Sequence, residues 1–203
     1  MRKRIVPVLW VLLLLGFVPA SSQEPKILPG QRFLLLATSA TETMQMELDK
    51  ALAQGFRIVA GSSRGNSEIV FVLERKGKPA ESVDYKLVAT METPTFQKEV
   101  SELAAQGYRA VPHTFIIKPH VMAGPEIVVV MERSPNSAKR YDYLLLATTL
   151  TSTLEKEWAE AAGQGYQLVG MLTRAELMVL LEKEVVGRPS ARNQGASTYR
   201  SAS

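Results

Sequence analysis

Apolar and polar positions follow the same order three times along the chain. Residues 33–56, 85–108 and 143–166 align without a gap. Each stretch opens with an apolar run ending in Ala-Thr, keeps a Thr and a Glu at fixed places, and closes on Gln-Gly and an aromatic residue. Repetition at a fixed spacing defines the structural unit of a fold. The sequence therefore predicts three repeats, at residues 31–77, 84–135 and 141–186.

Each repeat is predicted to begin with a strand that continues into a helix. The strands, at residues 33–37, 85–89 and 143–147, are apolar on both faces except at Lys86, which is typical of strands covered on two sides. In the helices, apolar residues recur at i, i+4, i+7 and i+8. These positions are Met44, Leu48, Ala51 and Leu52, then Phe96, Val100, Leu103 and Ala104, then Leu154, Trp158, Ala161 and Ala162.

The ends of these helices carry capping signals. Thr41, Thr93 and Thr151 stand where an N-cap belongs. The three helices are predicted to stop at Gly55, Gly107 and Gly165, each followed by an aromatic residue, as in a left-handed C-terminal cap.

Two further strands complete each repeat, which gives the order β-α-β-β. The second strands lie near residues 57–59, 109–111 and 167–169, and the third at 69–73, 127–131 and 177–181. The first and third strands are the most apolar, so they are expected to be neighbours, with the second at the edge. One helix covers only one face of a sheet, so the other face must meet another repeat. We expect an α+β fold in which three tandem repeats share one core, with pseudo-threefold packing as the preferred arrangement.

The two ends of the chain are expected to lie outside this fold. Residues 1–22 combine Arg2, Lys3 and Arg4 with an apolar run at 8–18 and small residues before Gln23, as in a secretory signal peptide. The apolar run is shorter than the roughly 20 residues of a spanning helix, so cleavage and no stable membrane span are expected. This predicts a periplasmic or secreted protein. Residues 187–203 lack apolar periodicity and are predicted to be a disordered tail.

Composition excludes several classes of protein. The chain has no Cys, which excludes disulfides and a lipid-anchored cysteine. Its formal net charge of +4 comes largely from basic residues near the two ends. Nucleic-acid binders usually cluster Lys and Arg on one face of the folded body. We therefore expect no nucleic-acid partner.

The turn from helix to strand carries a family resemblance. Gln-Gly-Phe-Arg-Ile-Val at 54–59, Gln-Gly-Tyr-Arg-Ala-Val at 106–111 and Gln-Gly-Tyr-Gln-Leu-Val at 164–169 resemble the Glu-Gly-Trp-x-hydrophobic-Val hallmark of a small bacterial family, domain of unknown function 4177. Gln stands in place of the usual Glu, and Tyr or Phe in place of Trp. That family has no assigned activity, so the resemblance implies a fold and no catalytic residue.

Candidate chemistry is sparse. Glu47, Glu99 and Glu157 recur on the helices and would form a carboxylate cluster under threefold packing, although the simpler interpretation is a solvated or ion-paired Glu. The only two histidines lie in the enlarged second hairpin, at residues 112–125. Their spacing matches no metal-ligand motif.

The second hairpin is the candidate partner-binding site. The candidate residues are His113, Phe115, Ile116, Lys118, His120 and Met122. Apolar loops on a rigid scaffold often bind partners. Alternatively, the hairpin folds back and covers the core.

The sequence favours an exported, non-catalytic protein that binds an unknown protein or small molecule in the cell envelope, or acts structurally. No cofactor, metal or catalytic residue is expected. The alternative is a metal-dependent or His/carboxylate enzyme that uses the second hairpin.

Overall fold

The computed structural model describes residues 27–65, 67–77, 83–120, 124–135 and 137–185. The predicted signal peptide and the predicted tail lie outside these residues. The described part of the chain contains three helices and three antiparallel sheets, which confirms the predicted α+β class. None of its helices has both the length and the apolar character needed to span a bilayer.

The elements fall into three consecutive segments. Segment 1 contains β1 (Phe33–Thr38), α1 (Thr41–Ala53), β2 (Phe56–Arg64) and β3 (Glu68–Arg75). Segment 2 contains β4 (Asp84–Thr90), α2 (Thr93–Ala105), β5 (Arg109–Ala110), β6 (Ile116–Lys118) and β7 (Glu126–Arg133). Segment 3 contains β8 (Arg140–Thr148), α3 (Thr151–Gly163), β9 (Gln167–Thr173) and β10 (Leu177–Val185).

Each segment forms one sheet with its last strand in the middle. The strand orders are β1-β3-β2, β4-β7-β5 and β8-β10-β9, and β6 pairs with β7 beyond the short β5. The prediction that the first and third strands are neighbours, with the second strand at the edge, is confirmed. The strand predicted at 57–59 is longer than expected, because β2 continues through Gly61, Ser62 and Ser63 to Arg64.

The helix starts differ from the prediction by one residue. The N-cap residues are Ala40, Glu92 and Leu150, and none makes a side-chain cap, so the assignment of Thr41, Thr93 and Thr151 was wrong. The Thr that ends each first strand instead provides a side-chain hydrogen bond near the helix start. The hydroxyls of Thr38, Thr90 and Thr148 accept hydrogen bonds from the N–H of the three N-cap residues at 3.2, 3.4 and 3.2 Å.

The predicted C-terminal caps are confirmed. Gly55, Gly107 and Gly165 have φ values of 84°, 93° and 91°, in the left-handed region that favours glycine. The N–H of Tyr108 donates to the carbonyl of Leu103 at 3.1 Å, which is the long hydrogen bond of a Schellman cap.

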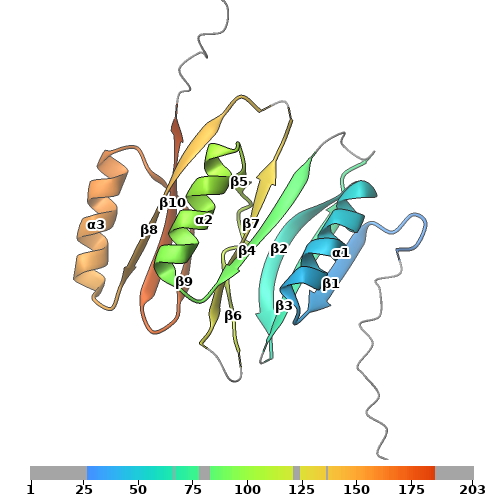
Figure 1. Ribbon diagram of the computed structural model, residues 1–203, viewed down its shortest axis with the longest axis horizontal. Helices are drawn as coiled ribbons and strands as arrows, with labels where there is room; N and C mark the ends of the chain where they lie inside the picture. Colours follow the sequence, from blue (N-terminus) through green and yellow to red (C-terminus); the bar gives the residue numbers. More distant parts are fainter. Residues whose placement is uncertain (1–26, 66, 78–82, 121–123, 136, 186–203) are drawn as a thin grey trace, which may run out of the picture.

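Buried apolar side chains form three clusters. The first cluster joins the inner face of the β1-β3-β2 sheet and α1 to Val128 and Val130 of β7. The second joins α2 and the opposite face of β7 to Met178 and Leu180 of β10. The third lies within segment 3. Segment 2 therefore lies between the other two, and Figure 1 shows the three helices side by side in chain order. A single shared core with pseudo-threefold packing is not confirmed.

The first sheet is covered less completely than the middle one. All five residues from Ile127 to Met131 are buried, as the prediction of cover on both faces requires. In β1, by contrast, Phe33 and Leu35 are 51% and 58% exposed. The prediction of cover on both faces is therefore wrong for the first sheet, because no described segment packs on its outer face.

Gly61 of β2 provides a test of how tightly the segments pack. A methyl carbon added there would lie 2.7 Å from the backbone oxygen of His113 and 2.9 Å from Cε1 of Phe71. Real Cβ atoms do not approach backbone so closely, so Gly61→Ala should destabilise the fold by about 1–3 kcal/mol through overpacking. Thermal or urea unfolding measures this change.

Gly163, in the last turn of α3, is the matched control for that substitution. Nothing lies within 4 Å of the position that its Cβ would occupy. Gly163→Ala should leave stability unchanged or raise it by up to about 1 kcal/mol, because Ala favours the helix. Equal effects of the two substitutions would contradict the close contact between β2 and the second hairpin.

Candidate functional site

The second hairpin turns inward immediately after His113. The backbone of His113 is left-handed, with φ of 65°. Thr114 is fully buried, and its hydroxyl donates to the carbonyl of Val111 at 2.7 Å and accepts from the N–H of Val130 at 2.9 Å. Phe115 is buried against Phe96, with ring centroids 5.7 Å apart. The apolar start of the hairpin is thus part of the second cluster.

The far side of the hairpin is held by an ion pair whose lysine is buried. Lys118 is only 4% exposed, and its Nζ lies 2.8 Å from Oε2 of Glu126. The same Nζ donates to the hydroxyl of Thr41, at the start of α1, at 3.4 Å. A buried charge needs such partners, so Lys118 fixes β6 against segment 1.

The six candidate residues are therefore not gathered on one surface. Phe115 and Lys118 are buried and Ile116 is half-buried, whereas the side chains of His113 and His120 are exposed. Met122 lies outside the described residues. The buried positions favour the alternative that the hairpin covers the core.

The described residues contain no group of three His, Cys, Asp or Glu side chains that could hold a metal ion. Glu47, Glu99 and Glu157 lie on three different helices of the row rather than around one axis. Neither candidate for carboxylate or histidine chemistry has a described cluster to support it.

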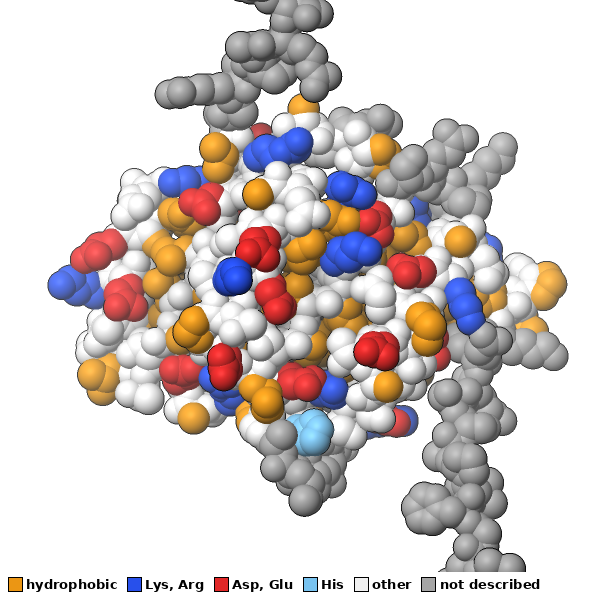
Figure 2. All heavy atoms as spheres, in the orientation of Figure 1, with side chains coloured by type: hydrophobic (Ala, Val, Ile, Leu, Met, Phe, Trp, Pro, Cys, Tyr) orange, Lys and Arg blue, Asp and Glu red, His pale blue; other side chains and the backbone are white. Residues whose placement is uncertain are grey.

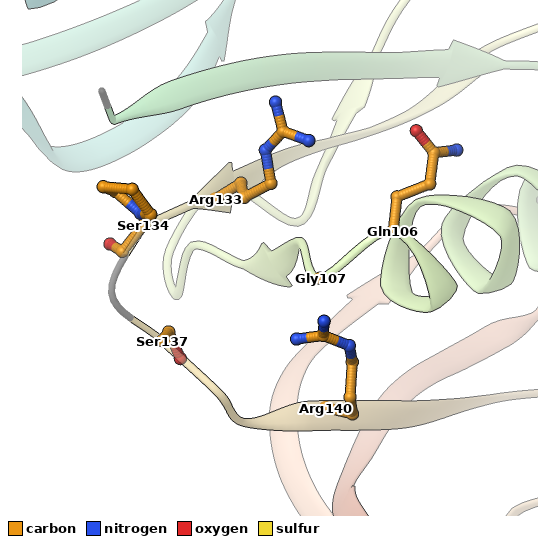
Figure 3. A pocket seen from close by; sticks show the side chains of 7 residues that line it. Gln106, Gly107, Arg133, Ser134, Ser137 and Arg140 are labelled. Atoms are coloured by element: carbon orange, nitrogen blue, oxygen red, sulfur yellow. The ribbon is translucent and has the colours of Figure 1, made fainter. Parts of the chain in front are cut away.

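A polar cleft of about 280 Å³ opens where segment 2 joins segment 3. Figure 3 shows Arg133 and Arg140 on opposite sides of this cleft, with Gln106 at the end of α2. Arg133 already pairs with Asp84 at 3.4 Å and stacks on the ring of Tyr108. The cleft also faces the C-terminal end of α2, where the helix dipole disfavours anions. These features indicate a structural junction rather than an anion site.

Charged side chains elsewhere also pair locally. On the face shown in Figure 2, acidic and basic side chains are interspersed, with no broad region of one sign.

An apolar groove lies beside α3 at one end of the row of helices. It has a volume of about 400 Å³ and is lined by Thr151, Leu154, Glu155, Trp158, Met171 and Leu177. Nearby, Leu168 is 51% exposed, and Met171 itself is 58% exposed. We call this surface the α3 groove, and it is the most apolar of the concave surfaces described here.

A second apolar surface lies at the opposite end of the row. It is the outer face of the β1-β3-β2 sheet, and we call it the β1 face. Its residues are Phe33, Leu35, Ala37, Val70 and Val72. Val70 and Val72 are half-buried, whereas Phe33 and Leu35 are largely exposed. Large apolar side chains gathered on a surface indicate a place where something packs.

The junctions between segments share a hydrogen-bonded clamp. Gln45 of α1 donates to the carbonyl of Tyr85 at 2.9 Å and accepts from the N–H of Leu87 at 2.8 Å. Gln97 of α2 makes the same pair of hydrogen bonds to β8. It donates to Tyr143 at 2.8 Å and accepts from Leu145 at 2.7 Å. One amide thus satisfies both backbone groups on the free edge of the next sheet.

A tyrosine hydroxyl completes each junction. The hydroxyl of Tyr143 accepts from the N–H of Ala110 at 2.7 Å and donates to Oε2 of Glu182 at 3.0 Å. Arg109 binds the same Glu182 with two guanidinium nitrogens, at 2.5 and 3.1 Å. Tyr85 occupies the equivalent place between segments 1 and 2, within 3.4 Å of the N–H of Ile58.

Burial changes the acidity of these hydroxyls. Burial, with the Glu182 carboxylate as a further cause, raises the pKa of Tyr143, and burial together with Glu132 raises the pKa of Tyr85. Both groups therefore stay neutral and keep their hydrogen bonds at physiological pH.

Neither the clamp nor the tyrosine was identified from the sequence. A signal was present, because Gln45 aligns with Gln97, and Tyr85 aligns with Tyr143. The direction of these side chains, toward the next segment, follows only from the way the segments pack.

No protein-family model, curated protein or solved structure matches the chain. The resemblance to domain of unknown function 4177 therefore stays a prediction from the sequence.

Gln97→Glu should weaken the junction between segments 2 and 3. A carboxylate still accepts the N–H of Leu145 but places negative charge beside the carbonyl of Tyr143. The expected loss is about 1–3 kcal/mol of unfolding free energy, measured by urea titration. Glu155→Gln, at the aligned and exposed position of α3, should change stability by less than about 0.5 kcal/mol at dilute concentration. Similar losses for both variants would contradict the clamp.

High pH should destabilise the protein through the buried tyrosines. Their pKa values are raised in the folded state, so their contribution is fully present below about pH 10, the ordinary tyrosine value. It is lost as pH rises above that value, because the unfolded chain releases the protons more easily. Unfolding free energy should therefore decrease above pH 10, and less steeply in the double variant Tyr85→Phe/Tyr143→Phe. Equal slopes in the two proteins would argue against this cause.

Proposed function

We propose that this is a non-catalytic binding or structural protein that makes its contacts through the α3 groove and the β1 face. The proposal rests on one comparison of exposure. Phe33 is 51% exposed on the β1 face, whereas the aligned Tyr85 and Tyr143 are 1% and 3% exposed. The aromatic residue at this position is buried wherever a preceding segment is present. The exposure of Phe33 therefore indicates a surface that binds a partner.

The chain is further proposed to be an array of three tandem repeats. Three observations support this: the shared element order, the shared strand order, and the recurrence of the glutamine clamp at both junctions. In repeat arrays each unit covers its neighbour, and the terminal units differ from the inner ones. Two apolar ends are what such an array leaves uncovered.

Export to the periplasm or secretion is part of the same proposal. It is supported by the basic, apolar and small-residue order of residues 1–22. A partner in the cell envelope would then meet the protein after cleavage. The broad, open and apolar surfaces favour a protein partner over a small molecule, because small ligands are usually enclosed.

The candidate residues of the second hairpin have a secondary place in this proposal. Their buried members, Phe115 and Lys118, hold the segments together, which leaves only the exposed tip for contact. An enzyme that uses His113 or His120 remains the alternative. It predicts stoichiometric metal in the purified protein, lost in His113→Ala or His120→Ala.

Pull-down from a cell-envelope extract tests the proposed surfaces. Met171→Glu should abolish capture of a partner bound at the α3 groove, because a charge in the apolar contact is costly to desolvate. Leu35→Glu tests the β1 face in the same way. Met46→Glu is the control, since Met46 is 57% exposed and lies on α1, away from both surfaces.

Equal capture by the wild type and all three variants would overturn the proposed surfaces. Unfolding temperatures close to that of the wild type would confirm that each variant is folded.

A further inference from the structure

The two end surfaces correspond to the two sides of the internal junctions. At each junction, one side is a helix with its sheet, and the other is the outer face of the next sheet. Tyr85, Val128 and Val130 supply the second side where segment 2 meets segment 1. Tyr143, Met178 and Leu180 supply it where segment 3 meets segment 2. In segment 1 the aligned residues are Phe33, Val70 and Val72, which form the β1 face.

The α3 groove has the character of the first side. Leu154 and Trp158 of α3 align with Phe96 and Val100 of α2, both fully buried under segment 3. Leu168 of β9 aligns with Ala110, whose N–H bonds to the hydroxyl of Tyr143 from the next segment. No described segment packs on this side of segment 3, and Leu168 is accordingly exposed.

A polar contact near the helix starts also recurs at both junctions. Lys118, paired with Glu126, donates to the hydroxyl of Thr41 at the start of α1. At the next junction Arg174, paired with Glu176 at 3.2 Å, lies 3.5 Å from the hydroxyl of Thr93 at the start of α2. In both cases a cation that pairs with a Glu next to the start of a central strand donates to the hydroxyl of the threonine that begins the helix of the preceding segment.

Both halves of this contact are present in the two outer segments. Arg64 at the end of β2 pairs with Glu68 at the start of β3 at 2.5 Å, and the Arg64 side chain is largely exposed. Thr151 starts α3, is exposed and lines the α3 groove. One end thus carries the cation with its Glu, and the other end carries the threonine.

We propose that the β1 face of one copy of the chain packs against the α3 groove of a second copy, as each segment packs on the one before it. The inference rests on the proposed function and names its partner. The junction would bury Phe33, Leu35 and Met171, and bring Arg64 of one copy to Thr151 of the other.

Two differences from the aligned residues of the internal junctions make this junction weaker. Glu155 stands where Gln45 and Gln97 form the clamp, so it can accept from the N–H of Leu35 but cannot donate to the carbonyl of Phe33. Phe33 itself lacks the hydroxyl of Tyr85 and Tyr143. Association between copies is therefore reversible, whereas the internal junctions are tethered by the chain.

The contact joins two different surfaces, so each copy keeps one free surface of each kind after pairing. Such head-to-tail contacts close into rings or extend into filaments rather than stopping at a symmetric dimer. Assembly should therefore grow with protein concentration.

Two single variants and their mixture test this geometry, with purified protein as the probe. Leu35→Glu removes the β1 face and Met171→Glu removes the α3 groove, each at a side chain that is 58% exposed. By sedimentation velocity and light scattering, the wild type should assemble with increasing concentration. Each variant alone should be monomeric at concentrations where the wild type assembles, because association is weakened by about tenfold or more, the effect of about 1.4 kcal/mol.

An equimolar mixture of the two variants should form a dimer that does not grow further. The Leu35→Glu copy still offers its α3 groove, and the Met171→Glu copy still offers its β1 face, so the mixture has one intact junction. Met46→Glu should assemble like the wild type. The double variant Phe33→Tyr/Glu155→Gln restores the clamp and the hydroxyl, and should associate more tightly than the wild type.

A wild type that stays monomeric up to about 1 mM, the concentration scale of a very weak complex, would overturn the proposal. A mixture that stays monomeric, or assembly that survives in either single variant, would also overturn it. These outcomes are separate from failure of the proposed function. If the purified chain is monomeric while Met171→Glu still abolishes capture from extract, the surface is a binding site for another protein.

Discussion

The packing of α1 and α2 against the free edge of the next sheet is the contact on which the described part of the chain depends. Gln45 and Gln97 each supply one donor and one acceptor to a strand that has no strand partner on that side. Unpaired backbone groups in a buried place are costly, so the two amides allow an apolar helix to lie directly beside a sheet edge. The tyrosine hydroxyls then accept from an N–H of the preceding segment. Apolar side chains fill the junctions, and the ion-paired Lys118 and Arg174 contact the starts of α1 and α2.

Local features of the fold could be predicted from the sequence, because each depends on residues close together in the chain. Apolar periodicity gave the three helices and the central strands, and glycine followed by an aromatic residue gave the helix ends. The helix starts were misassigned by one residue, since two threonines compete for the turn and the one at the end of the strand accepts the N–H. Local pattern does not show which of two similar hydroxyls has the better geometry.

Packing between segments could not be predicted in the same way. The apolar outer face of β1 suggested cover on both sides, but periodicity reports only that a surface is apolar and not what covers it. The second hairpin presented the same difficulty. From the sequence, Phe115 and Lys118 fit a binding site and a core equally well. Their packing partners decide between the two, because Phe115 contacts Phe96, and Lys118 contacts Glu126 and Thr41.

The second hairpin also gives the row of segments a property that simple arrays lack. The backbone at His113 lies against Gly61 of segment 1, and the ring of Phe115 lies against Gly170 of segment 3. In an array where each unit touches only its neighbours, the ends can open independently. The second hairpin contacts both outer sheets. Unfolding of one outer segment therefore removes contacts that also stabilise the other. Such a chain is expected to lose its structure in one concerted transition, and it would resist pulling or proteolysis as a whole rather than unit by unit.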